Sequence, residues 1–141
     1  MQRHTLLAAA ASLLTSFAAA QSCSTLTVTG TGAPGTSVTF AVDGTAAGAF
    51  AILAVSDAAG TTTLNFGSIG TLVLGVNSPF IPLPLGMTDA SGDVSRTVNV
   101  PNGNIPGVDL VGQGVTVEVA FTGGLSLTFC TSNVATFHLG S

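Results

Sequence analysis

Hydrophobic and polar residues alternate along most of the chain, most clearly over Gly114–Thr131. Valine and phenylalanine occupy every second position of Val115–Phe121, and leucine and phenylalanine do so over Leu125–Cys130. Because successive side chains of a strand point to opposite faces, each half is predicted as a strand with one buried face. The Gly-Gly step between them favours a tight turn. We therefore predict a β-hairpin here, with the other strands packed on or beside it.

Shorter segments of the same kind precede and follow this hairpin, separated by clusters of Gly, Pro, Asp and Asn that favour turns. The further predicted strands are Cys23–Thr29, Thr36–Asp43, Gly48–Asp57, Thr61–Phe66, Thr71–Val76, Asp93–Val100, Val108–Val111 and Val134–Leu139. Gly48–Asp57 is apolar on both faces, which predicts a central strand. Ser78–Gly86 contains prolines that cannot donate to a strand ladder, which predicts an extended crossover or an edge segment. A turn is predicted at residues 131–133.

Short strands at near-regular spacing, without helical periodicity after the first twenty residues, predict an all-β fold. The simplest architecture with these features is an antiparallel β-sandwich, as an immunoglobulin-like or jelly-roll variant. Residues 21–141 are long enough for one domain with its own core, and no linker divides them.

Residues 1–20 have the layout of a secretory signal peptide. A basic start with Arg3 precedes an apolar run over Leu6–Leu14, and Ala18-Ala19-Ala20 supplies a cleavage site of small residues. The run is too short to span a bilayer comfortably, and no later stretch is long and apolar enough to do so. We therefore expect a secreted or surface-exposed chain, with the periplasm as the alternative compartment.

Charged residues are scarce, at 6% of the chain. After residue 20 the single basic side chain is Arg96, against six acidic ones. One arginine cannot neutralise a row of phosphates, so nucleic-acid binding is excluded as a function class, and attachment to anionic membranes is disfavoured. With so few charges to protect strand edges from pairing, the edges are predicted either to be covered by loops and prolines or to be shared with a protein partner or a second copy.

Cys23 and Cys130 are the two cysteines. In an oxidising compartment, a single pair without metal-like spacing predicts one disulfide. Both cysteines share a strand face with Ser and Thr, so we expect the bond to join the N-terminal strand to the penultimate strand near a sheet edge. A core bridge between two sheets is not expected.

Asp89, Ser91 and Asp93 place two carboxylates and a hydroxyl at alternate positions, which loosely resembles a calcium loop. Such a loop has a glycine at its sixth position and a bidentate glutamate at its twelfth. Both are missing here, and Val100 stands at the twelfth position. The alternative is a hairpin turn with aspartate at its start. Calcium is the one cofactor that the sequence suggests, and the turn is the simpler interpretation.

No catalytic motif is present, so the protein is not expected to be an enzyme. His138 lacks the surroundings of a G-x-S-x-G or HExxH site and is predicted as an edge or partly exposed strand residue. Glu118 is predicted either to pair with Arg96 across strands or to be solvated. The absence of Trp and Tyr weakens a glycan platform; the phenylalanines are predicted mostly as core, with Phe80 as the one that loops could expose.

The chain resembles the small secreted Gly/Leu/Pro-rich β-sandwich domains of planctomycete-type bacterial proteins. The resemblance rests on Gly48–Ser56, Ile81–Pro84 with Gly86–Gly92, Val98–Pro101, Gly123-Gly124-Leu125, Ser132-Asn133 and Leu139-Gly140, and it covers most of residues 35–140 in order. It implies a secreted sandwich and supplies no catalytic residues. The Cys23/Cys130 pair and Glu118, where the family tends to have Gln, depart from the pattern.

These observations predict a secreted, non-enzymatic structural or cell-surface interaction protein that self-assembles through strand edges. The alternative is an extracellular glycan- or calcium-binding β-sandwich module.

Overall fold

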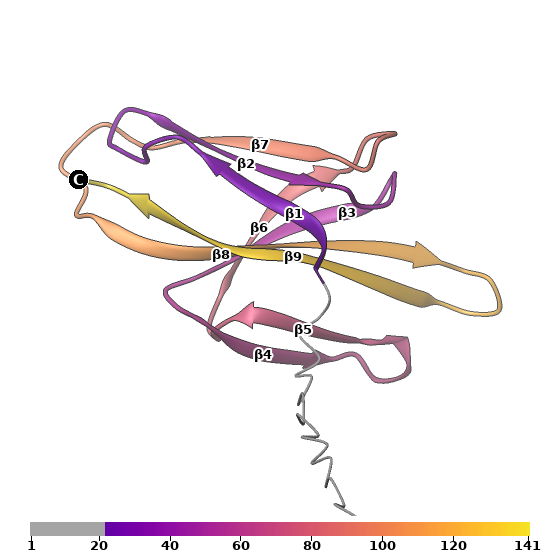
Figure 1. Cartoon of the computed structure of the whole chain (residues 1–141). Coiled ribbons are helices and arrows are strands. Elements are labelled where there is room, and N and C mark those ends of the chain that lie inside the picture. Colours follow the sequence, from indigo (N-terminus) through magenta and orange to yellow (C-terminus); the bar gives the residue numbers. More distant parts are fainter. Residues whose placement is uncertain (1–21) are drawn as a thin grey trace, which may run out of the picture.

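The computed structural model describes residues 22–141, which form nine β-strands and one short 3-10 helix (Figure 1). The strands are β1 (Ser22–Thr29), β2 (Ser37–Asp43), β3 (Phe50–Ser56), β4 (Ala59–Asn65), β5 (Thr71–Val76), β6 (Ile81–Met87), β7 (Val94–Asn99), β8 (Val108–Ala120) and β9 (Ser126–Leu139), with helix η1 at Gly67–Ile69. The predicted all-β class is confirmed. The predicted signal peptide, residues 1–20, lies outside the described residues. Across residues 22–141, no helix has the length and hydrophobicity needed to cross a bilayer.

Seven strands form one sheet in the order β6-β3-β8-β9-β1-β2-β7, and β4 and β5 form a separate two-stranded sheet. Every neighbouring pair is antiparallel except β1 and β9, which are parallel. The prediction of a wholly antiparallel sheet was therefore wrong for this pair. A parallel pair cannot be joined by a tight turn, and β1 and β9, as the first and last strands, need no such connection.

The seven-stranded sheet curls so that its two halves face each other. Figure 1 shows β1, β2 and β7 as a layer above β8 and β9. The edge strands β6 and β7 approach each other, and Arg96 Nη1 donates a hydrogen bond to the carbonyl oxygen of Pro84 across the seam. The inner face of the curled sheet encloses the first core: Leu26, Val38, Phe40, Val42, Ala51, Leu53, Leu85 and Val100.

The hairpin β4–β5 covers the outer face of the sheet and forms the lowest layer in Figure 1. Its alternating side chains pack against β3 and β8 in a second core: Ala54, Leu72, Leu74, Val76, Val111 and Val115. Both faces of the middle strands are therefore covered. This agrees with the prediction that Gly48–Asp57, which is apolar on both faces and contains β3, forms a central strand. The proline-rich β6 lies at a sheet edge, as predicted.

Strands β8 and β9 form the predicted hairpin, with Val117 opposite Phe129 and Val119 opposite Leu127. Both strands are longer than predicted, because the segments taken as separate strands on each side run on without a break. The turn predicted at residues 131–133 was wrong. Ser132 Oγ accepts from the backbone N–H of Gly114 at the irregularity in β8, and the Asn133 side chain bonds the N–H and carbonyl of Leu26. These polar side chains bond neighbouring strands and do not form a turn.

Cys23 and Cys130 form the predicted disulfide, with their Cα atoms 5.7 Å apart. The bond joins adjacent strands of one sheet, so it is not an inter-sheet bridge, in agreement with the prediction. Its expected position near an edge was wrong, and β9 is the last strand, not the penultimate one. Strands β1 and β9 lie in the middle of the seven-strand order, and Cys23 is exposed at the start of β1, before the ladder with β2 begins at Thr25.

Candidate functional site

The outer end of the β8–β9 hairpin exposes hydrophobic side chains. Val119 is 53% exposed, Phe121 77% and Leu125 49%. We call residues 119–125 the hairpin tip. In Figure 1 the tip projects beyond the end of β4–β5 and beyond the rest of the sheet. An extended hairpin that carries apolar groups away from the body is the most prominent surface feature of the described chain.

The apolar face of this hairpin is covered only along its base. Phe66, beside η1, stacks on Phe129 with ring centroids 5.5 Å apart, and Val117 and Phe129 pack against the second core. The same face continues with Leu127 and Val119. Leu127 is partly buried beside Gly70 of the β4–β5 connection, whereas Val119 is exposed. Alternation in the sequence predicted a buried face along the whole hairpin, and this was wrong for the tip because the covering layer ends first.

Charge is absent from the tip. No charged residue occurs between Val119 and Asn133. Glu118, on the strand just before the tip, is exposed, and the structure gives no ion pair between it and Arg96 within residues 22–141. Of the two predictions for Glu118, the solvated side chain therefore agrees with the structure. The tip is an electrically neutral surface on a chain with net negative charge.

The phenylalanines are distributed differently from the prediction. Phe80, singled out as the one phenylalanine that loops could expose, is half-buried against the second core, whereas Phe121 is among the most exposed large hydrophobic residues. Phe50 and Phe66 are also partly exposed. No local signal distinguished Phe121 from the other alternating residues, because the length of β8 and β9 became known only from the structure.

The predicted Asp89–Asp93 segment folds as a tight turn between β6 and β7. Asp89 Oδ1 accepts hydrogen bonds from the backbone N–H groups of Ser91 and Asp93, at 2.9 and 3.0 Å. Asp93 Oδ1 accepts from the N–H of Gly44, at 3.1 Å. Each carboxylate thus uses one oxygen to hold a loop. In the part of the chain that the structure covers, no cluster of three His, Cys, Asp or Glu side chains is placed to hold a metal.

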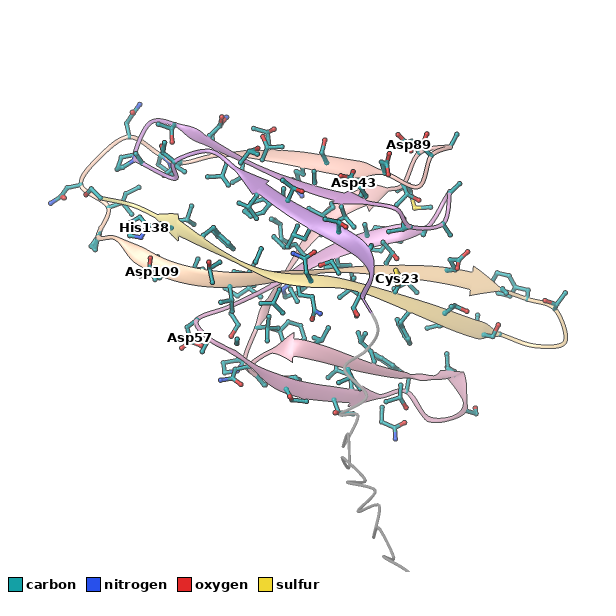
Figure 2. The ribbon with its side chains drawn as sticks, in the orientation of Figure 1. Cys23, Asp43, Asp57, Asp89, Asp109 and His138 are labelled. Atoms are coloured by element: carbon teal, nitrogen blue, oxygen red, sulfur yellow. A yellow bond between two sulfur atoms is a disulfide. The ribbon has the colours of Figure 1, made fainter. Side chains whose placement is uncertain are left out.

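A second polar group lies at the opposite end of the hairpin. His138 Nδ1 lies 2.7 Å from Asp109 Oδ1, and both side chains are exposed. Figure 2 shows the pair at the outer ends of β8 and β9, with Asp57 on the same side of the molecule. All three line a shallow open groove. His138 is thus a partly exposed strand residue, as predicted. Its acidic partner Asp109 was not predicted, because the two residues meet only through the register of the β8–β9 ladder.

No family model matches the chain, and neither a curated protein nor a solved structure does so.

Proposed function

We propose that the protein is a secreted, non-enzymatic structural or cell-surface interaction protein that self-associates through the hairpin tip. The observation that supports this most directly is the exposure of Phe121 on a projecting, charge-free tip. Water-exposed aromatic side chains at the centre of an apolar patch are typical of contact surfaces.

A second copy of this chain is the occupant that fits the tip best. Six acidic residues and one basic residue after position 20 disfavour an acidic partner, and the tip itself carries no charge that would attract a basic one. Two tips in contact would bury Val119, Phe121 and Leu125 of each copy, and Glu118 is the nearest charge on each side. Contact between neutral surfaces avoids the repulsion that other faces of two acidic chains would meet.

The strand edges are less suited to self-assembly than the tip. Pro82 and Pro84 lie within β6 and have no N–H to donate, so this edge cannot add a regular antiparallel strand. The other edge, β7, lies beside β6 at the seam of the curled sheet. Edge pairing remains the alternative route, through β7 or through the edges of the two-stranded sheet β4–β5.

The replacement Phe121→Asp is expected to convert associated species of the oxidised chain into monomer. A charge placed at the centre of an apolar contact opposes desolvation, and the association constant should fall at least tenfold. The mass in solution, measured by light scattering over a range of concentrations, tests this. Electron microscopy then distinguishes closed oligomers from filaments.

The matched control is Ile81→Asp, because Ile81 is 71% exposed but lies on edge strand β6, away from the tip. It should leave the association unchanged. A monomeric unmodified chain at all concentrations, or equal effects of the two substitutions, would refute assembly through the tip.

The alternative of an extracellular glycan- or calcium-binding module concerns different residues. For glycans, Phe121 and Phe66 offer partly exposed rings that could stack on a sugar. For calcium, the free oxygens of Asp89 and Asp93 and the hydroxyl of Ser91 remain the predicted ligands.

Calcium binding at this turn would raise the melting temperature by several degrees at concentrations well above the dissociation constant. Asp93→Ala should abolish that increase, whereas Asp109→Ala, at the opposite end of the molecule, should retain it. Identical melting curves with calcium and with chelator would exclude the calcium site.

The fold is best described, as part of this proposal, as a variant of the immunoglobulin-like or jelly-roll β-sandwich in which one curled sheet supplies both layers. The facing of β1, β2 and β7 over β3 and β8 supports it. The Cys23–Cys130 disulfide supports a location outside the reducing cytosol. The resemblance to planctomycete-type secreted domains stays a prediction.

A further inference from the structure

An apolar cavity of ≈ 260 Å³ lies inside the curled sheet, at the end where the chain finishes. Phe40, Val55, Leu83, Val98, Ile105 and Phe137 are among the side chains that line it. Phe40 and Phe137 meet edge to face, with ring centroids 5.1 Å apart, and form one wall. A cavity of roughly 150 Å³ with an apolar lining stays dry and takes up benzene. At the same cavity volume per ligand atom, this cavity holds a molecule of about ten non-hydrogen atoms.

The cavity lies beside the seam between β6 and β7, because Leu83 of β6 and Val98 of β7 both line it. These strands are joined by the Asp89–Asp93 turn, and no ladder pairs them. Pro82 and Pro84 leave the edge of β6 without N–H donors at these positions, so the seam cannot close by strand pairing. Leu83 from β6 and Val98 from β7 face the cavity from the two sides. The prolines therefore prevent a regular ladder between β6 and β7.

Arg96 does not line the cavity but lies next to residues that do. It stands opposite Phe40 in the β2–β7 register and two residues before Val98, on the same face of β7. Its Nη1 reaches the carbonyl oxygen of Pro84, the neighbour of Leu83, across the seam. Within residues 22–141 the structure gives Arg96 no ion pair, so guanidinium N–H groups stay available to a ligand.

We propose that this cavity binds a small amphipathic carboxylate, with the aliphatic or aromatic part inside the sheet and the carboxylate on Arg96. Asn99 is the one polar residue among the lining residues and the others are apolar, which favours an apolar chain inside the cavity. The guanidinium is the only positive charge in the described part of the chain, apart from a protonated histidine, and matches a carboxylate geometrically. This site is independent of the hairpin tip and of the association that the tip supports.

Calorimetric titration of the oxidised chain with octanoate tests the proposal, with 1-octanol as the uncharged probe of similar length. Octanoate should bind with a dissociation constant on the order of 0.1–1 mM. Arg96→Gln should weaken octanoate about tenfold and leave octanol within twofold, since only the charged head contacts the guanidinium. Arg96→Lys, which keeps the charge, should retain most of the affinity.

The second test fills the cavity with a larger side chain. Val98→Phe should abolish binding of both probes, and Ile105→Phe, a loop substitution on another wall, serves if the first variant fails to fold by circular dichroism. Val73→Phe, on the outward face of β5, makes the same change away from the cavity and should bind normally. No octanoate binding by the unmodified chain, binding unaffected by both filling variants, or equal losses of octanoate and octanol in Arg96→Gln would overturn the proposal.

Discussion

Replacing both Cys23 and Cys130 by serine is expected to lower the free energy of unfolding by about 4–5 kcal/mol. The disulfide closes a loop between residues 107 positions apart, so it removes much of the conformational entropy of the unfolded chain. Strand β1 also depends on it locally. Its parallel ladder with β9 consists of two residue pairs with an irregularity between them, and the Asn133 side chain bonds Leu26 further along.

Urea unfolding followed by far-ultraviolet circular dichroism measures this loss, since the chain has no Trp or Tyr for fluorescence. The control is the same experiment in a strong thiol reductant, where the unmodified chain and the double variant should unfold alike. A loss below about 1 kcal/mol under oxidising conditions would contradict the entropic role assigned to the bond.

Gln113→Leu is expected to destabilise the protein by about 2–4 kcal/mol. Gln113 is 5% exposed, its Oε1 accepts from the N–H of Gly75 at 2.7 Å, and its Nε2 donates to the carbonyl of Ser132 at 2.9 Å. One amide thus ties β8 to β5 in the covering hairpin and to β9. Leucine has a similar size but leaves a buried N–H and a buried carbonyl without partners.

The destabilisation should be concentrated in the covering hairpin. A Cβ at Gly75 would lie 2.7 Å from Val134 Cγ2, so the backbone of β5 approaches the sheet closely at the point where Gln113 holds it. Hydrogen exchange at the Gly75 amide should therefore accelerate by an order of magnitude or more. Thr63→Val, an exposed change on β4, is the control and should cost less than about 0.5 kcal/mol. Unchanged protection of Gly75 in Gln113→Leu would show that the amide does not secure this layer.

Most strands could be predicted from the sequence, because alternation is a relation between neighbouring residues and the burial of one face leaves it visible. The hairpin around residues 114–131, the central β3 and the edge position of β6 are examples. Errors arose where polar residues had non-local partners. Ser132 and Asn133 have the composition of a turn, but Gly114 and Leu26, distant in sequence, bond their side chains within a continuous strand.

Among the candidate sites, those formed by neighbouring residues could also be predicted from the sequence, and those formed by distant residues could not. The Asp89–Asp93 turn was identifiable because an aspartate that accepts from the next residues is a local arrangement. The exposure of Phe121 was not identifiable, because it depends on where a separate hairpin stops covering β8 and β9. The cavity and its neighbour Arg96 likewise arise from strands β2, β3, β6, β7, β8 and β9 meeting in space.

The sequence by itself determined the all-β class, most strand positions and the cysteine pair, since strand periodicity, turn chemistry and cysteine number need no knowledge of distant contacts. Only the tertiary structure decided the parallel pairing of β1 with β9, the curling that brings β6 beside β7, and the coverage of the hairpin by β4–β5. These depend on which apolar faces pack together after the chain has closed long loops. For that reason the features proposed to carry function, the exposed tip and the apolar cavity, became visible only in the folded molecule.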